Sequence, residues 1–390
     1  MDYQSYMSRR AKDVPRVGSR ESGDWADAAR KEGVDVVSLS GAPLTLPGPN
    51  VIEAAARAAR EFAKAPSRGL PELREAISHK VQREQGFTAD PGTEILITNG
   101  AMQALYVIMT ALLDPGDEIL VTRPGFFYHG IAELVGARCV YLPTDESQQY
   151  RYDIDAFERV ITNRTKLFML TSPNNPTGHV ATRKELEGIA RLADKHDLLV
   201  VSDDSYEKMV YDGRQHISFA SLDGVKERAI TVQSFTKSYA MSGWRVGYII
   251  AKQPLIETFL KVLEWMVLAC GYVQQKAAAA AMTGPQDWVD AIGHDFQQYR
   301  DAMCGGLDEI DGLTYVRPEG GPFVFPNVSR FGMSASDFAR YILDEFGVRS
   351  EPGEVFQEPG HIRLAFGARS VKDVETATER LRAAADKLRT

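Results

Sequence analysis

Residues 166–202 have the sequence KLFMLTSPNNPTGHVATRKELEGIARLADKHDLLVVS. The short runs 166–170 and 198–202 are apolar on both faces, which is typical of strands buried in a parallel sheet. A helix is expected between them over 183–196, because parallel neighbours need a long crossover connection. The segment therefore predicts a strand–helix–strand unit of an α/β fold.

The same alternation continues in both directions along the chain. Further helices are expected over 101–113 and 126–135. The predicted strands cover 94–98, 118–121, 139–142, 166–170, 198–202, 229–233 and 246–250. Seven strands with crossover helices predict a doubly wound, mostly parallel seven-stranded sheet.

The pattern changes after Pro285. A long amphipathic helix over 288–310, two further helices and short strands at 314–316, 323–325 and 362–365 predict a smaller α+β domain at the C-terminus. The segment 24–40 is expected to pack with that domain, because a short helix and a short strand at 36–39 cannot bury themselves alone. We therefore expect an N-terminal arm at 1–45, a large domain at 46–290 and a small domain at 291–390.

Composition excludes several classes of protein. The chain of 390 residues is 44% hydrophobic and 25% charged, which is ordinary for a globular protein. Its net charge of −8 argues against nucleic acid or an anionic membrane as partner. Cys139, Cys270 and Cys304 lack metal-ligand spacing and are odd in number, so neither a metal site nor a disulfide framework is expected. A polar N-terminus without an apolar core points to the cytoplasm.

The segment 234–247, SFTKSYAMSGWRVG, follows directly on a predicted buried strand. A lone lysine is most often a solvated surface residue. Here, however, Lys237 stands at the end of a buried strand, with Ser234, Thr236 and Arg245 close in sequence. Hydroxyls and one fixed positive charge suit a dianionic phosphate ester.

Acidic residues follow the next predicted strand, in the segment 198–206, LLVVSDDSY. A buried carboxylate there can pair with a protonated ring nitrogen and make that ring an electron sink. Such an Asp is also a common helix cap. Asp203 and Asp204 compete for the role, and spacing does not separate them. Tyr206 supplies a phenol three residues after Asp203.

Three more segments carry polar or aromatic candidates at strand ends. The loop 171–178, TSPNNPTG, is stiffened by two prolines and aims the amide of Asn175, although the same residues also form plain turns. Gly100 precedes a helix whose N-terminus, at Ala101 and Met102, is a seat for phosphate. Phe126 follows a strand and can stack on a flat ring or pack in the core.

Arg363 lies among apolar residues in a predicted strand of the small domain, in the segment GHIRLAF at 360–366. A guanidinium in such a place needs an anion. It binds a carboxylate through two parallel hydrogen bonds, so Arg363 is either a clamp for a substrate carboxylate or half of a structural ion pair.

Taken together, these motifs resemble the class I and II aminotransferases of pyridoxal-phosphate fold type I, from about Val36 to the C-terminus. A helix with PELREA at 71–76, the Asn-Gly-Ala turn, SPNNPTG, SDxxY, SxTKxxxxxGWRxGY and RLAF occur in family order. The resemblance implies pyridoxal 5'-phosphate as cofactor. It also implies a homodimer with shared active sites.

The resemblance assigns a role to each candidate. Lys237 would carry the cofactor as a Schiff base and then act as acid and base, and Asp203 would pair with the ring nitrogen. Tyr206 and Asn175 would bond the ring oxygen. The implied remaining contacts are ring stacking by Phe126, phosphate binding by Gly100, Ala101, Met102, Ser234, Thr236 and Arg245, and substrate-carboxylate binding by Asn175, Arg363 and the Ser40–Gly41–Ala42 backbone.

One position departs from the family. Five residues before Gly69 the family commonly has a tyrosine that reaches the phosphate of the neighbouring subunit, and here Lys64 stands there. The expected activity is transfer of an amino group between an L-amino acid and a 2-oxo acid by a ping-pong mechanism. The alternatives are a lyase, decarboxylase or oxidase of specialised metabolism that uses the same cofactor, and a non-enzymatic effector domain of a regulator.

Overall fold

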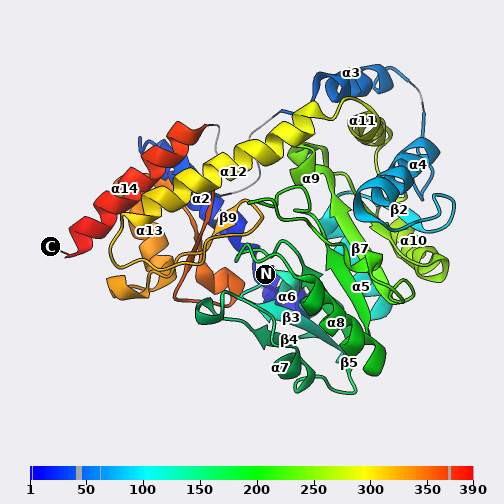
Figure 1. The fold of residues 1–390 in the computed structure, drawn as a ribbon, viewed down its shortest axis with the longest axis horizontal. Coiled ribbons are helices and arrows are strands. Elements are labelled where there is room, and N and C mark those ends of the chain that lie inside the picture. Colours follow the sequence, from blue (N-terminus) through cyan, green and yellow to red (C-terminus); the bar gives the residue numbers. More distant parts are fainter. Residues whose placement is uncertain (2, 41–45, 62, 368–369, 390) are drawn as a thin grey trace.

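The computed structural model describes residues 1, 3–40, 46–61, 63–367 and 370–389. Its centre is the sheet drawn in Figure 1, with strand order β2-β8-β7-β6-β5-β3-β4. The strands are β2 (Ile95–Thr98), β3 (Glu118–Arg123), β4 (Arg138–Pro143), β5 (Thr165–Thr171), β6 (Leu199–Asp203), β7 (Ala229–Ser234) and β8 (Gly247–Ile250). β8 is antiparallel to both neighbours and the other pairs are parallel, so the predicted mostly parallel seven-stranded sheet is confirmed.

Side chains that alternate along each strand bury both faces of the sheet. On β5, Leu167 and Met169 pack in one apolar cluster, and Phe168 and Leu170 pack in the opposite one. The first cluster is covered by α5 (Ala101–Leu112), α6 (Tyr128–Val135) and α10 (Gln253–Val267), and the second by α7 (Ile154–Glu158) and α8 (Arg183–Lys195). Burial on both faces explains the continuous apolar runs of these strands.

Three helices and several short turns complete the larger unit. The helices α3 (Pro49–Ala58), α4 (Pro71–Lys80) and α11 (Tyr272–Thr283) pack together beside β2 and β8. The short elements are η2 (Val81–Gln85), η3 (Glu146–Gln148), η4 (Phe219–Ser221), α9 (Phe235–Ser238) and η5 (Ser242–Trp244). α9 is only one turn long, yet it carries Lys237 directly from the end of β7.

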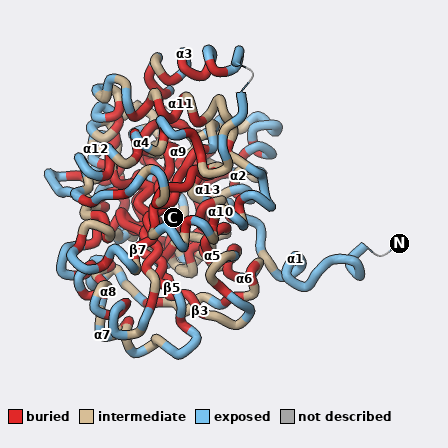
Figure 2. Tube along the Cα trace, turned by 90° about the vertical axis from the view of Figure 1, so that its right-hand side faces the viewer, coloured by how far each residue is buried: buried red, intermediate tan, exposed pale blue. Residues whose placement is uncertain are grey.

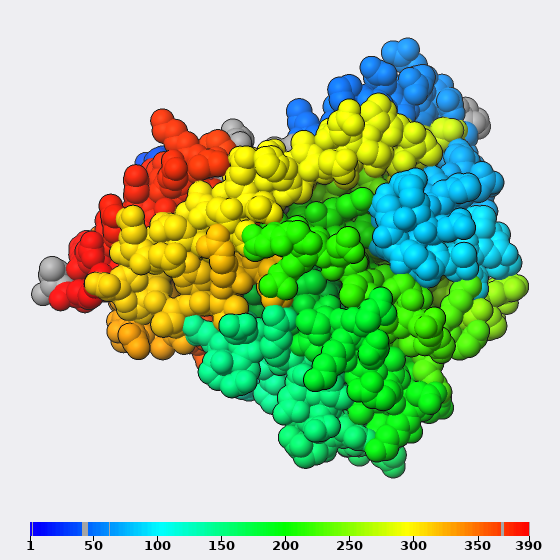
Figure 3. Space-filling view, viewed as in Figure 1, coloured from blue at the N-terminus to red at the C-terminus, as the bar shows by residue number. Residues whose placement is uncertain are grey.

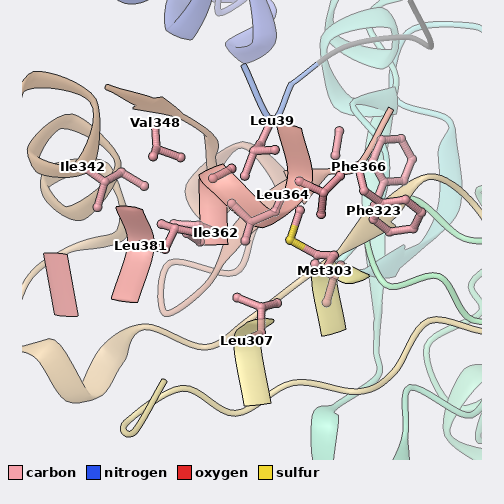
Figure 4. Packing of buried hydrophobic residues seen from close by; sticks show 14 of the residues in the cluster. Leu39, Met303, Leu307, Phe323, Ile342, Val348, Ile362, Leu364, Phe366 and Leu381 are labelled. Atoms are coloured by element: carbon pink, nitrogen blue, oxygen red, sulfur yellow. The ribbon is translucent and has the colours of Figure 1, made fainter. Parts of the chain in front are cut away.

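The C-terminal part forms a second unit around its own apolar cluster, which Figure 4 shows. Met303 and Leu307 from α12 meet Ile362 and Leu364 from β12 there. The elements are α12 (Asp287–Asp308), β9 (Phe323–Val324), η6 (Ser329–Phe331), α13 (Ala335–Phe346), β10 (Val348–Arg349), β11 (Glu351–Pro352), η7 (Gly353–Phe356), β12 (Ile362–Ala365) and α14 (Val371–Arg389). In Figure 3, α12 runs from this unit along the larger one.

The strand expected over 314–316 does not form. Thr314 makes a single isolated bridge with Asn327. Pro318, close behind, has no N–H with which to extend a ladder. The three-stranded sheet of this unit has the order β11-β12-β9 and is antiparallel.

The N-terminal segment lies against this second unit. β1 (Val37–Ser38) pairs in parallel with β10, and Ala26 and Ala29 of α2 (Gly18–Lys31) pack with Leu343 of α13. Figure 2 shows η1 (Tyr3–Tyr6) and α1 (Arg9–Asp13) as an exposed arm that extends from the body. Among the described helices, none combines the length and apolarity needed to cross a bilayer.

Candidate active site

A cavity of about 310 Å³ lies where the carboxyl ends of the sheet strands face the C-terminal unit. Ligands of open α/β sheets bind at this edge, outside the ends of the strands. The wall contains side chains from both units and from the start of α2. The lining residues are Val17, Ser19, Arg20, Ala101, Met102, Leu105, Phe126, Phe127, Thr171, Asn175, Asp203, Ser205, Tyr206, Ser234, Thr236, Lys237, Arg245, Phe323 and Arg363.

Lys237 projects into this cavity from α9. Burial, with the positive charges of Arg363 and Arg245, lowers the pKa of its amine to about 7. The Nζ atom lies 5.8 Å from the centre of the Tyr206 ring. Within the described ranges no carboxylate forms an ion pair with it. A substantial fraction of the amine is therefore neutral and nucleophilic near neutral pH.

Asp203, at the end of β6, supplies the carboxylate of the cavity. Its Oδ1 accepts hydrogen bonds from Ser205 Oγ at 2.5 Å and from the Ser205 N–H at 3.2 Å. The Tyr128 hydroxyl donates to Oδ2 at 3.3 Å. Burial raises the pKa of Asp203 to about 6, and the charge of Asp204 adds to the rise, against the lowering effect of the Ser205 hydrogen bonds.

Asp204 points elsewhere, which separates the two acids. Ser202 Oγ and Ser218 Oγ donate to its carboxylate at 2.6 and 3.1 Å, and His216 Nε2 lies 3.4 Å from it. Asp204 does not line the cavity, whereas Asp203 does. The alternation of side chains along the chain thus gives the two adjacent acids different environments.

A chain of hydrogen bonds joins the C-terminal unit to the sheet. Arg363 Nη1 donates to Asn175 Oδ1 at 2.9 Å, and Asn175 Nδ2 donates to the Tyr206 hydroxyl at 3.3 Å. The Arg363 guanidinium is buried over the rings of Phe323 and Phe356, with its carbon 4.4 and 4.8 Å from their centres. Its Nε has no hydrogen-bond partner among the described residues. A buried donor without a partner favours an anionic ligand at this place.

The opposite end of the cavity is suited to a phosphate. Gly100 has φ of 81° and precedes α5, and a Cβ built there would lie 2.5 Å from Arg245 Nη2. Glycine adopts this positive φ without strain and leaves room for the guanidinium. Arg245 Nη1 also donates to Thr236 Oγ1 at 3.3 Å. The first N–H groups of α5 have no acceptor within the helix and can bind an anion. The positive charge of Arg245, the Thr236 hydroxyl and the positive end of the α5 dipole therefore lie together at this end of the cavity.

These residues fit pyridoxal phosphate. The cofactor needs an amine, a carboxylate for its ring nitrogen and a cradle for its phosphate, and the cavity offers them in Lys237, in Asp203 and in Arg245, which lies close to Gly100. Phe126 lines the same cavity, with its ring 5.3 Å from that of Tyr128. Of the predicted site residues, Gly41 and Ala42 lie outside the described residues. Lys64 is exposed and does not line the cavity of its own chain.

Comparison with known proteins places these motifs in a family. The family model described as "Aminotransferase class I and II" matches residues 35–381. The chain belongs to this family.

Among relatives of this aminotransferase, the aspartate aminotransferase of Pyrococcus abyssi is 36% identical over 321 residues, 81% of this chain and 82% of that protein. Aromatic-amino-acid aminotransferase 2 of Thermococcus litoralis is 35% identical with the same coverage. The structure of aspartate aminotransferase from Thermus thermophilus with maleate has a TM-score of 0.92 and 34% identity, and the match covers 97% of this chain and 99% of that one. The predicted family, fold, aminotransferase activity and pyridoxal-phosphate cofactor are confirmed.

Sequence reasoning missed several residues in the cavity of this aminotransferase. Ser205 could have been predicted from the sequence, because a hydroxyl two residues after an Asp often forms a hydrogen bond with that Asp in a turn. Arg20 could not, since its place depends on how α2 docks on the C-terminal unit. The other additions are Val17, Ser19, Leu105, Phe127, Thr171 and Phe323.

Proposed function

We propose that this aminotransferase works by two half-reactions in ping-pong order, with Lys237 both holding the cofactor and moving the proton. Bound pyridoxal phosphate supplies an aldehyde carbon that condenses with amines and a ring that withdraws electrons. The observation that carries the proposal is the Lys237 amine with a pKa of about 7 in one cavity with the buried Asp203. A base with such a pKa exchanges protons efficiently near neutral pH.

The other residues would hold and orient the reactants. Arg363, with its free Nε, is placed to bind the α-carboxylate of the amino acid. Asn175 links Arg363 to Tyr206 and so couples substrate binding to the ring-oxygen side of the cofactor. Asp203 would hold the ring nitrogen, Phe126 would stack on the ring, and Ala101, Met102, Ser234, Thr236 and Arg245 would hold the phosphate.

We propose an acidic amino acid as one substrate, on the basis of Arg20. Two other arginines line the cavity and already have assigned anions, the phosphate at Arg245 and the α-carboxylate at Arg363. The exposed guanidinium of Arg20 forms no hydrogen bond or ion pair within the described part of the chain, and Arg20 lies in the first turn of α2, where a cation is unfavourable. A second carboxylate on the substrate would pair with this guanidinium in the cavity. A relative named aspartate aminotransferase and a homologous structure with maleate are consistent with this choice.

The position of Arg20 is fixed by contacts between α2 and the C-terminal unit. Ser22 Oγ donates to Glu351 Oε1 at 2.9 Å, and Arg349 Nη2 donates to the Ser19 carbonyl at 2.7 Å. A Cβ on Gly18 would lie 2.4 Å from Val355 Cγ2, so the helix start is packed closely. Arg20 is therefore presented to the cavity by an anchored helix.

We further propose a homodimer. The end of α10 exposes a run of apolar side chains, with Trp265 94% and Leu268 71% exposed. Nearby on α5, Met102 at the phosphate end of the cavity is 37% exposed, and Arg245 is exposed as well. A second copy would cover apolar surface and close the cradle. A cytoplasmic location is proposed from the three unpaired cysteines, Cys139, Cys270 and Cys304.

The test of the reaction is a spectroscopic half-reaction. Purified holoenzyme is mixed anaerobically with single amino acids, aspartate first, while the absorbance of the bound cofactor is recorded. We expect the Schiff-base band to disappear and to return on addition of a 2-oxo acid. Turnover in which the band persists would contradict transamination and favour the lyase, decarboxylase or oxidase alternative. A donor other than aspartate would overturn only the substrate assignment.

A further inference from the structure

We propose that Ser205 is a positioning residue for Asp203: its hydroxyl and its N–H occupy Oδ1 and keep the carboxylate ionised and oriented for the ring nitrogen. The inference rests on the proposed pairing of Asp203 with that nitrogen. Both Ser205 donors reach the same oxygen, at 2.5 and 3.2 Å. Among the described residues, Oδ2 accepts a hydrogen bond only from Tyr128, at the longer distance of 3.3 Å, and so retains acceptor capacity.

The partners of the two adjacent acids show why this donor matters. Asp204 has a histidine, His216, 3.4 Å away in addition to two serine hydroxyls. Asp203 forms no ion pair with a basic side chain in the described ranges, and its donors are neutral. A buried carboxylate without a cation is stable in its charged form only through such hydrogen bonds. Ser205 therefore keeps the Asp203 carboxylate negatively charged, so that it can pair with the protonated ring nitrogen of the cofactor.

Tyr128 is the weaker of the two side-chain donors to Asp203. Its hydroxyl also lies 2.6 Å from Thr171 Oγ1, a shorter contact than the one to Asp203. The Ser205 hydroxyl donates directly, and Ser205 lines the cavity beside Asp203. Of the described donors to Asp203, Ser205 makes the shortest hydrogen bond.

Loss of the hydroxyl has a predictable effect on the cofactor. Asp203 would become a stronger base, and the shared proton would move from the ring nitrogen toward the carboxylate. A neutral ring nitrogen stabilises the deprotonated Schiff base less well than a cationic one. The pH midpoint of the Schiff-base absorbance change should therefore rise, on the order of half a unit to one unit, in Ser205→Ala.

The experiment compares three variants of the holoenzyme. Ser205→Ala removes the donor, and Ser205→Cys keeps a side chain of similar size with a weak donor. Ser202→Ala is the matched control, because it removes a buried hydroxyl that bonds Asp204 at 2.6 Å outside the cavity. For each protein, the pH midpoint of the cofactor absorbance and the dissociation constant of pyridoxal phosphate from the apoprotein are measured.

We expect the midpoint to rise in Ser205→Ala, to rise less in Ser205→Cys and to stay unchanged in Ser202→Ala. Cofactor affinity should fall several-fold in Ser205→Ala. Unchanged midpoints in both Ser205 variants, or an equal change in Ser202→Ala, would overturn the inference even if thermal stability falls. If Ser205→Ala does not fold, Ser205→Cys decides. A wild-type protein without a Schiff-base band would instead refute the proposed function itself.

Discussion

Asp203 and Asp204 illustrate how neighbouring residues of one type acquire different chemistry. The strand end directs Asp203 into the cavity and Asp204 toward Ser202, Ser218 and His216. Burial raises the pKa of Asp203 to about 6, so the carboxylate is mostly ionised near neutral pH but takes up a proton more readily than an exposed Asp does. Donors such as Ser205 then determine which partner holds the proton.

Arg20 provides a test of substrate choice at the residue scale. We expect Arg20→Ala to lower kcat/KM for acidic amino acids roughly tenfold or more, because a charged hydrogen bond contributes about 1.5–3 kcal/mol, and to leave neutral amino acids nearly unaffected. Steady-state kinetics with aspartate and with alanine measure the ratio.

The matched control is Arg16→Ala. Arg16 lies just before α2, is exposed and pairs with Asp24 at 2.8 Å outside the cavity. Loss of the Arg16 side chain should change kcat/KM neither for aspartate nor for alanine. Equal decreases in kcat/KM for acidic and neutral amino acids in Arg20→Ala would show that Arg20 does not bind the side-chain carboxylate of the substrate.

At the scale of elements, the loop 171–182 is held between the two units by His179. The imidazole lies 3.1 Å from Glu185 on α8 and 3.3 Å from Glu319 of the C-terminal unit. Although burial opposes it, the two carboxylates raise the pKa of His179 above its ordinary value. Hydrogen bonds, first of all from His179, lower the pKa of each glutamate to about 2, although burial opposes this as well.

The sign of the resulting pH dependence follows from these shifts. The raised pKa of His179 contributes its full stabilisation below about pH 6.5, the pKa of an unfolded histidine. This contribution is lost as the pH rises through the pKa of His179 in the folded protein. The lowered pKa values of Glu185 and Glu319 stabilise it above about 4.5, and this contribution is lost as the pH falls toward 2. The free energy of unfolding of the wild type should therefore exceed that of His179→Gln most between about pH 4.5 and 6.5. Urea unfolding at several pH values measures it, and a pH-independent difference would refute the charged pair.

At the level of single elements, the sequence predicted the strands best, because the strands of the central sheet are buried on both faces. All seven central strands and helices α5, α6, α8 and α12 were predicted, because apolar runs and helical periodicity mark them directly. α11 was not: its alanine-rich stretch is buried on most sides, so little polar face marks a helical period. Lys237, Asp203, Asn175 and Arg363 follow strand ends or lie in a strand, which is why motifs located them. Arg20 depends on the docking of a distant helix, which no local pattern contains.

At the scale of the whole molecule, the cavity lies between the sheet and the C-terminal unit, so both must be in place for function. The division into 1–45, 46–290 and 291–390 stays a prediction. The helix α12 extends along both units in Figure 3.

The proposed homodimer is tested by a charge on the exposed end of α10. Trp265 is 94% exposed in the single chain, so Trp265→Glu should not disturb the fold. If that surface is covered by a second copy, the buried charge will weaken association strongly. Light scattering should then show a dimer for the wild type and a monomer for Trp265→Glu, with weaker cofactor retention. A wild-type monomer, or a dimer in both proteins, would contradict the interface.

The central claim is that Lys237 holds the cofactor, and one measurement tests it most directly. The holoenzyme is reduced with borohydride, which fixes a Schiff base as a stable amine, and is then digested for mass spectrometry. We predict the pyridoxyl mass on the peptide that contains Lys237, and its absence in Lys237→Ala. The same mass on another lysine, such as Lys64 or Lys80, or no modified peptide at all in the wild type, would contradict the account.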